Sequence, residues 1–270
     1  MSGITNVHRV NTNNVGDQAS TPIHYYDFGP VRELDIKFAV RDDETLTPTV
    51  IIGGGGMLNF EPSMDTLMQR KPAGAKYIGW GLSGGSKQLW CVKDQIRLHN
   101  DEVLPPYPWY MDKFDLLGIR DWNTGYRWVP CVSCMSKAFD TAPAPKHEVV
   151  VYKHRAVDIP GLPKLPTSHS RTEDHPTLKS AINFIASGAV VLTNSYHGAY
   201  WGMLLKRKVI LVNGFWMTMK GYRFRPAYAT HKDWRKRVKT APIHNEALEI
   251  SREANRLFHA DVMNYLGQAP

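Results

Sequence analysis

The residues of this chain best placed to do chemistry form the segment Asn194-Ser195-Tyr196-His197-Gly198. An apolar run precedes it at 189–193, residues that suit a short helix follow at 199–205, and a second apolar run covers 209–212. This order predicts a parallel strand–helix–strand unit, whose first turn opens at the carboxyl edge of the sheet, where ligands bind. His197, at the start of the helix, is the candidate general acid or base. Around it, the helix N–H groups can hold an anionic donor, and the candidate donor-binding residues are Asn194, Ser195, Tyr196 and Gly198.

Two other apolar runs end in glycine-rich turns. The run 49–52 leads directly into Gly53-Gly54-Gly55-Gly56, and the run 77–80 leads into a turn that contains Gly81, Ser83 and Gly84. Glycine lets the backbone approach a ligand closely and adopt positive φ, so we expect both turns to be substrate loops at one edge of one sheet. Their spacing matches neither the dinucleotide fingerprint nor the Walker A motif. Close packing of strand against helix is the alternative that the sequence leaves open.

Two charged turns complete the candidate site. Asn14 and Gly16 precede Asp17, whose carboxylate could hold acceptor hydroxyls or act as a general base. The same residues also suit any tight turn. Farther along, Arg120 and Asp121 follow the apolar run that ends at residue 119. An arginine there can bind a carboxylate or phosphate with two parallel hydrogen bonds, or it can form a local salt bridge with its neighbour.

The elements that must position these turns alternate between strands and helical or loop segments, which indicates an α/β fold. Helices are expected at 176–187 and 245–266, and the Pro/Ala stretch 141–146 is a candidate hinge. We therefore predict two Rossmann-like domains facing a cleft: 1–142 on the acceptor side, and 143–270, with the C-terminal helix, on the donor side. Strands are expected at 6–10, 35–40, 49–52, 77–80, 116–119, 149–152, 190–193 and 209–212.

Composition is that of an ordinary globular protein. The chain has 270 residues, of which 43% are hydrophobic, and no window approaches the roughly 18 apolar residues that cross a bilayer. The first 14 residues are polar, so we expect a cytoplasmic protein without a membrane span. Three cysteines cannot all pair, and Cys131 and Cys134 lack the second ligand pair that a structural zinc needs, so no metal site is expected.

Charge is concentrated late in the chain. The formal net charge is +8, and the window 220–239 holds eight Lys or Arg against one acid, with aromatic residues between them. Cations interleaved with rings suit phosphates and stacked bases or sugars, although a solvated basic surface is the alternative. The possible polyanion contacts are Lys220, Arg223, Arg225, Arg235, Lys236 and Arg237.

In this order, the motifs resemble the polysaccharide pyruvyl transferase family over residues 11–213. The likeness lies in an early Asn-Val-Gly-Asp, a glycine run, a turn like Gly79-Trp80-Gly81, an Arg-Asp pair, and a late turn that contains His197. The resemblance implies a GT-B-like fold and transfer of a pyruvyl group from phosphoenolpyruvate to saccharide hydroxyls as a ketal, without a required metal or cofactor. It also implies that His197 is the acid/base or donor-phosphate contact and Arg120 the anion clamp.

The late turn departs from the family pattern. Family enzymes commonly have Arg-Leu-His there, whereas this chain has Ser195-Tyr196-His197. Without that arginine, serine offers the donor carboxylate one hydroxyl and no charge. Two alternatives therefore stand beside the pyruvyl transferase: a glycosyltransferase that uses a nucleotide-sugar donor to modify hydroxymethylated bases in DNA, and a glycan-binding protein without turnover.

Overall fold

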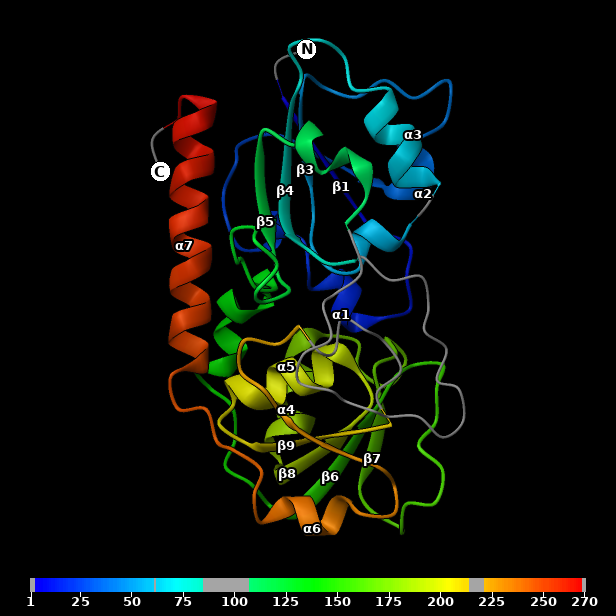
Figure 1. The fold of residues 1–270 in the computed structure, drawn as a ribbon, viewed down its shortest axis with the longest axis vertical. Coiled ribbons are helices and arrows are strands. Elements are labelled where there is room, and N and C mark those ends of the chain that lie inside the picture. The colour runs from blue at the N-terminus through cyan, green and yellow to red at the C-terminus, as the bar shows by residue number, and fades with distance from the viewer. Residues whose placement is uncertain (1–2, 61, 85–106, 214–220, 269–270) are drawn as a thin grey trace.

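The computed structural model describes residues 3–60, 62–84, 107–213 and 221–268, and it contains two five-stranded parallel sheets, one in each lobe of the molecule (Figure 1). The N-terminal sheet has the order β2-β1-β3-β4-β5. Short helices cover it, with α2 (Ile36–Ala39) and α3 (Ser63–Gln69) on one side. Its strands are β1 (Ile4–His8), β2 (Val31–Asp35), β3 (Thr49–Ile52), β4 (Lys76–Leu82) and β5 (Leu116–Ile119).

The C-terminal sheet has the order β10-β9-β8-β6-β7 and is again parallel throughout. Helices α4 (Leu178–Ala186) and α5 (Tyr196–Leu204) pack beside it, and α6 (Trp234–Val238) lies at its outer end (Figure 1). Its strands are β6 (His147–Lys153), β7 (Thr167–His169), β8 (Gly188–Thr193), β9 (Lys208–Val212) and β10 (Ala227–Ala229). Two parallel sheets in one chain confirm the expected α/β architecture.

The unit β8-α5-β9 forms as the sequence predicts. β8 and β9 pair in parallel, with Val190 opposite Lys208, and α5 crosses between them. Ser195 begins the helix, because its hydroxyl accepts a hydrogen bond from the Gly198 N–H at 3.3 Å. Every residue from His197 to Leu204 is buried, so this helix is covered on all sides. That explains why its residues are apolar around the whole circumference.

One predicted strand is wrong. The segment 35–40 reads as an apolar run, but the strand β2 ends at Asp35, where α2 begins. The Asp35 carboxylate accepts a hydrogen bond from the Lys37 N–H at 3.0 Å, which caps the helix. A short apolar run fits strand and helix equally well, and here the capping side chain decides between them.

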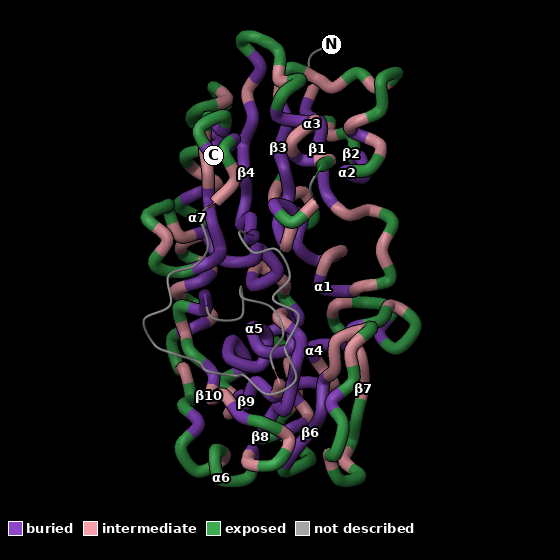
Figure 2. The backbone as a smooth tube through the Cα atoms, turned by 45° about the vertical axis from the view of Figure 1, so that its right-hand side comes forward, coloured by how far each residue is buried: buried purple, intermediate pink, exposed green. Residues whose placement is uncertain are grey.

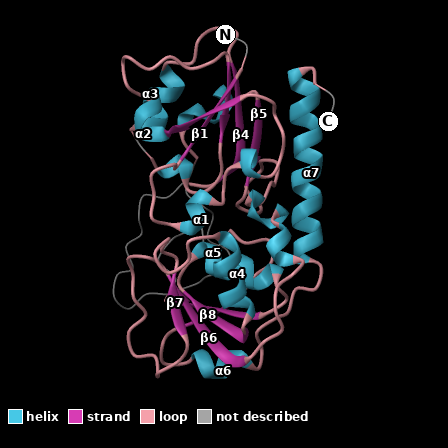
Figure 3. Ribbon diagram, turned by 180° about the vertical axis from the view of Figure 1, so that it is seen from behind, coloured by secondary structure: helices cyan, strands magenta, loops and turns pink. Residues whose placement is uncertain are grey.

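The C-terminal helix α7 (Ala247–Leu266) crosses from the C-terminal lobe to the N-terminal lobe (Figures 1 and 3). Its buried Phe258 packs edge-to-face on Trp80 of β4 with ring centroids 4.9 Å apart, and the Trp80 indole N–H donates to Asn255 at 2.9 Å. Sequence order groups this helix with the second half of the chain, but its buried Phe258, Val262 and Met263 belong to the hydrophobic cluster of the first sheet.

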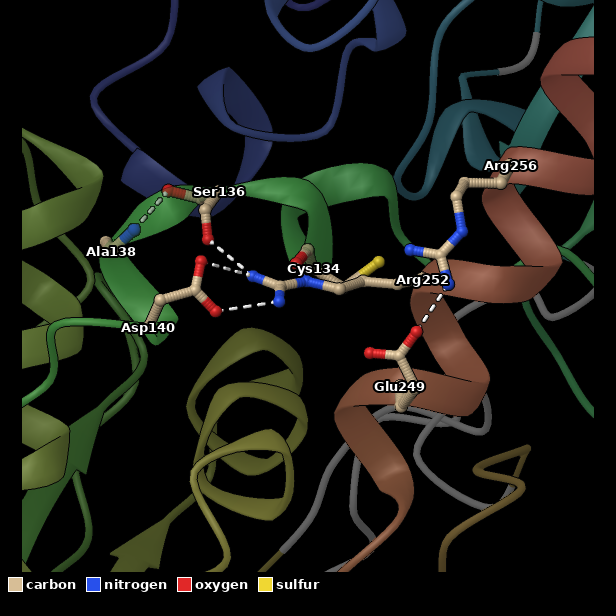
Figure 4. Close-up of polar contacts among 7 residues, drawn as sticks. All are labelled: Cys134, Ser136, Ala138, Asp140, Glu249, Arg252 and Arg256. Atoms are coloured by element: carbon tan, nitrogen blue, oxygen red, sulfur yellow. Dashed lines mark hydrogen bonds and ion pairs between the residues drawn. The ribbon is translucent and has the colours of Figure 1, made fainter.

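Arg252 ties α7 to the segment that joins the lobes (Figure 4). Its guanidinium donates to the Cys134 carbonyl at 2.9 Å and the Ser136 carbonyl at 3.2 Å, and it pairs with both oxygens of Asp140 at 2.7 and 3.1 Å. Four hydrogen bonds from one planar group fix the base of the helix.

The lobes meet where the carboxyl ends of their strands lie. The Val15 N–H, in α1 (Val15–Gln18), donates to the Ser170 carbonyl at 3.2 Å, and the Thr172 N–H donates to the Asn13 carbonyl at 3.1 Å. In Figure 2 the central strands of the two sheets and α5 are buried, while the edge strand β7 and the outer loops are partly or fully exposed. Among the residues described here, no helix is both long and apolar enough to cross a membrane.

Candidate functional site

His197 lies between the lobes, where two segments from outside its own lobe's sheet, 16–20 and the one that contains Cys131, meet its ring. Its Nε2 is 3.2 Å from the Ser20 hydroxyl and 3.5 Å from the Cys131 sulfur. On the other side, Gly16 lies so close that a Cβ at that position would be 2.1 Å from Nδ1. The side chain of His197 is buried, and burial followed by the nearby Arg120 charge holds its pKa well below the usual value. The imidazole is therefore neutral at pH 7, as a general base requires.

Arg120 is a buried cation next to this histidine. It is 6% exposed, and its guanidinium lies 3.6 Å from the centroid of the Tyr196 ring. Its Nε and Nη1 are buried and have no hydrogen-bond partner among the residues that the structure describes. A buried charge with unused donors is costly unless an anion accepts from it. The arrangement thus favours the anion clamp over the local salt bridge that the sequence also allowed.

Asp121, the next residue, faces a different set of partners. The Ser83 hydroxyl donates to it at 3.1 Å and the Tyr107 hydroxyl at 3.4 Å, and the Gly84 N–H also bonds to it. Burial raises the pKa of this carboxyl to about 6, despite the neighbouring Arg120 and these donors. Ser83 and Gly84, expected as substrate-loop residues, therefore hold Asp121.

Asp17 lies among three arginines. Burial raises the pKa of its carboxyl, and Arg9, Arg120 and Arg155 act in the opposite direction. Three cations around one carboxylate give this part of the molecule a positive balance, which suits an anionic ligand. Arg155 also donates to Asn13 at 2.9 Å, across the lobes.

Arg9 and Arg155 were missed by the sequence reasoning. Both follow the end of a strand, β1 for Arg9 and β6 for Arg155, at the same carboxyl edges that carry Arg120 and His197. Their position just after a strand was the sequence signal that could have identified them as site residues.

The four-glycine run is mostly used for packing. The N–H groups of Gly53, Gly54 and Gly55 donate to the carbonyls of Val7, Ser20 and Gly81, at 2.8, 3.0 and 3.3 Å. These three amides are therefore occupied, and the run does not present them to a phosphate. Gly55 and Gly81 have positive φ, and a Cβ at Gly84 would lie 2.4 Å from the Leu58 Cβ. At Gly56 a Cβ would meet one flexible side chain, the Asn59 amide at 3.3 Å.

The other residues around the late turn also have structural partners. Asn194 accepts from the His154 N–H at 2.7 Å and donates to the Val157 carbonyl at 3.0 Å. A Cβ at Gly198 would lie 2.4 Å from the Thr193 hydroxyl. Of the four residues expected to bind the donor, Tyr196 is the one whose ring packs on the Arg120 guanidinium. Likewise Asn14 caps α1, because its side chain accepts from the Gly16 N–H at 3.1 Å.

The basic window is divided between two places. Arg223 lies over the Trp122 and Trp128 rings at 4.6 Å each, close to Asp121. Arg235, Lys236 and Arg237 belong to α6, and the carbonyl of Val238 at the end of that helix accepts from Lys208, the first residue of β9. α6 therefore lies at the opposite end of the strands from His197, as all three whole-molecule views show. Arg225 is exposed, and Lys220 lies outside the described residues.

The two cysteines of the Cys131–Cys134 pair have different neighbours. Cys131 joins the His197 cluster, whereas the Cys134 sulfur accepts from Asn255 at 3.4 Å, and burial raises the pKa of its thiol to about 12. No group of metal-ligating side chains is present in the described ranges. Sequence reasoning found the pair of cysteines but had no signal that would bring Cys131 or Ser20 to the histidine.

Comparison with known proteins adds little. No family model matches the chain, and no curated protein matches it. Among solved structures, it is similar to the functional uncharacterized protein KP1_0663 from Klebsiella pneumoniae subsp. pneumoniae NTUH-K2044, with 17% sequence identity, over 84% of this chain and 92% of that chain, and a TM-score of 0.49. Function has to be argued from the site itself.

Proposed function

We propose that this protein is a GT-B-like group transferase that moves a pyruvyl group from phosphoenolpyruvate to hydroxyls of a saccharide acceptor. The observation that carries the proposal is the buried guanidinium of Arg120, two of whose nitrogens have no acceptor among the described residues, beside the neutral imidazole of His197. An anion-binding group and a general base within one buried cluster are what transfer from an anionic donor to a hydroxyl requires.

In this proposal, the donor lies among the arginines and the acceptor hydroxyl is bound next to His197. Arg120 binds the carboxylate or phosphate of the donor, and Arg9 and Arg155 add positive charge around it. His197 removes the proton from the attacking hydroxyl. Asp17 lies near the same arginines and can orient the acceptor hydroxyls.

The overall reaction balances without a metal or redox cofactor. One acceptor hydroxyl adds to C2 of phosphoenolpyruvate while C3 gains a proton and becomes a methyl group. A second hydroxyl then displaces phosphate from C2, which closes the ketal, and the second hydroxyl proton leaves with the phosphate. Each hydroxyl loses its proton as it attacks, so one general base close to the bound donor serves both steps.

Thermal shift with the variant Arg120→Met tests the proposal. Ligand at about 100-fold its Kd stabilises the native state by about 2.7 kcal/mol, so phosphoenolpyruvate should raise the melting temperature of the wild type. The variant should lose that shift, while its melting temperature without ligand should equal or exceed that of the wild type, because an unpaired buried charge has been removed. Arg235→Met, on exposed α6, is the control and should keep the shift.

Three results of the same experiment would redirect the proposal. A shift with nucleotide sugars and none with phosphoenolpyruvate would make the donor a nucleotide sugar. Donor binding without phosphate release on any acceptor would favour a binding protein. A full shift in Arg120→Met would remove Arg120 from the donor site.

The DNA-modifying alternative has weaker support. It needs one continuous basic surface beside the site, and α6 lies at the other end of the sheet. Of the expected polyanion contacts, Arg223 is the one whose ring contacts, with Trp122 and Trp128, lie next to the site.

A further inference from the structure

We propose that Ser20 is a positioning residue that holds the proton of His197 on Nε2, so that Nδ1 is the atom that accepts the proton of the attacking hydroxyl. The catalytic use of Nδ1 rests on the proposed function, whereas the assignment of the proton rests on the hydrogen bonds alone. Neither Ser20 nor the choice of ring nitrogen follows from the sequence pattern.

The hydrogen bonds of Ser20 carry the argument. Its side chain is buried, and its hydroxyl donates to the Gly16 carbonyl at 2.6 Å, a short bond that engages its one hydrogen. Toward His197 Nε2, at 3.2 Å, the oxygen can therefore act as an acceptor only. An acceptor opposite Nε2 requires that this nitrogen carries the proton. In a neutral ring, Nδ1 then holds the lone pair.

Cys131 is the competing partner. Its sulfur lies 3.5 Å from the same Nε2, and a thiol hydrogen pointed there would place the ring proton on Nδ1 instead. The thiol has another neighbour, the Ser133 hydroxyl at 3.2 Å, which itself accepts from the Trp201 indole at 3.0 Å. A thiol is a weak donor, and the hydroxyl of Ser20 is both closer and the stronger acceptor, so Ser20 sets the tautomer.

The backbone around Ser20 fixes the position of its oxygen. The Gly54 N–H donates to the Ser20 carbonyl at 3.0 Å, and the Ser20 N–H donates to the Asp17 carbonyl at 3.2 Å. A Cβ at Gly54 would lie 2.6 Å from the Ser20 carbonyl oxygen. The glycine run therefore acts on the site indirectly: it lets two strand exits meet closely enough to hold Ser20 against the histidine.

Gly16 gives Nδ1 its surroundings. A methyl group at this position would overlap the ring, so only a glycine lets the backbone of α1 lie directly against Nδ1. Asn14 and Asp17 lie in the same segment. In the reaction, the hydroxyl oxygen bonds to C2 of the donor as its proton moves to Nδ1, and the resulting imidazolium keeps its Nε2–H bond to Ser20. After the first addition, the imidazolium gives the proton to C3 of the donor, which becomes the methyl group; after the second attack, it gives the proton to the departing phosphate.

Nitrogen NMR of the protein with ¹⁵N-labelled histidine rings tests the assignment. The His197 signals are identified by their loss in His197→Gln, and the spectrum is recorded at neutral pH, where the ring is uncharged. In the wild type, Nε2 should show the protonated type of shift and Nδ1 the unprotonated type. Ser20→Ala should weaken or reverse that assignment, whereas Cys131→Ala, which removes the other neighbour of the same nitrogen, should retain it.

Two outcomes overturn the proposal. One is a wild-type spectrum that shows the His197 ring protonated on Nδ1. This measurement does not depend on the folding of any variant. The other is loss of the Nε2 proton in Cys131→Ala but not in Ser20→Ala. If transfer from phosphoenolpyruvate is measurable, kcat of Ser20→Ala should fall at least about tenfold with KM unchanged, since a general base contributes about 10²–10⁴-fold. If no transfer is measurable, the NMR result still decides the tautomer, so the failure of the two proposals can be told apart.

Discussion

Arg120 and Asp121 are adjacent in the chain, but the structure gives them separate surroundings. The guanidinium stacks on Tyr196 toward His197, while the carboxyl accepts from Ser83, Gly84 and Tyr107. Consecutive residues leaving a strand point to opposite sides, which separates them. The pair is thus no simple salt bridge, and the pH dependence comes from the carboxyl of Asp121.

For Asp121, burial raises the pKa from 3.8 in the unfolded chain to about 6 in the folded protein. Between these values the unfolded carboxyl is ionised while the folded one is protonated, so its contribution to stability is present below pH 4 and is lost as pH rises through 6. Asp121→Asn cannot ionise. Its unfolding free energy, relative to the wild type, should rise by up to about 3 kcal/mol from pH 4 to pH 7.

Urea denaturation of both proteins at several pH values measures this difference. Asp42→Asn removes a fully exposed carboxylate and should follow the wild type over the same range. A difference between Asp121→Asn and the wild type that stays constant with pH would mean that Asp121 is ionised in the folded protein throughout.

At the scale of residues, the sequence predicts which side chains belong to the candidate site better than it predicts which residues contact them. His197, Arg120 and Asp17 were expected from their positions at strand exits, and the structure brings them together. Ser20 and Cys131 were not expected to reach His197, because they are 177 and 66 residues away from it along the chain. Contacts of that length depend on how two lobes dock, which no local pattern records.

At the scale of elements, strands with a continuous apolar run were predicted closely, and three-residue strands were not. The strands β3 and β5 have the bounds expected from the sequence, and α5 begins at the serine-capped turn. By contrast, β7 and β10 have three residues each and were missed, since so short a segment has no measurable periodicity. The glycine run was found, but its use for packing depends on the neighbouring strand exit.

Gly54 tests that use. In Gly54→Ala, the new methyl group would meet the Ser20 carbonyl at 2.6 Å and the Trp80 carbonyl at 3.2 Å, and neither backbone atom can move freely. We expect a loss of about 1–3 kcal/mol in unfolding free energy, typical of overpacking. Gly56→Ala is the matched control: its nearest contact is the flexible Asn59 side chain at 3.3 Å, so the loss should be under about 0.5 kcal/mol.

Chemical denaturation of the two variants gives the comparison. Equal losses of unfolding free energy in the two variants would show that the whole glycine run excludes side chains. No loss in Gly54→Ala would show that the strand exits are not closely packed. Because Gly54 supports Ser20, its variant should also disturb the His197 ring signals, whereas Gly56→Ala should leave them unchanged.

At the scale of the whole molecule, α7 is the element that holds the two lobes in one arrangement. Its first residue, Ala247, belongs to the core of the C-terminal lobe, Arg252 binds the joining segment, and Phe258 with Val262 packs on the N-terminal sheet. The candidate site depends on that arrangement, since His197 comes from one lobe and Gly16 and Ser20 from the other. Sequence analysis predicts the helix and its apolar face, but not the lobe that the face covers.

Phe258→Ala should therefore destabilise the protein strongly. The ring is 1% exposed and packs on Trp80, and removing a buried phenylalanine ring costs about 3–5 kcal/mol. Leu257→Ala, at the neighbouring residue that is 53% exposed, should change stability by less than about 0.5 kcal/mol. Guanidinium denaturation followed by tryptophan fluorescence reports both lobes, because Trp80 lies in the first and Trp201 in the second. If α7 joins the lobes, Phe258→Ala lowers the denaturant midpoint of one single unfolding transition. A second, separate transition for the N-terminal lobe would show instead that the lobes unfold independently and that the helix stabilises only one of them.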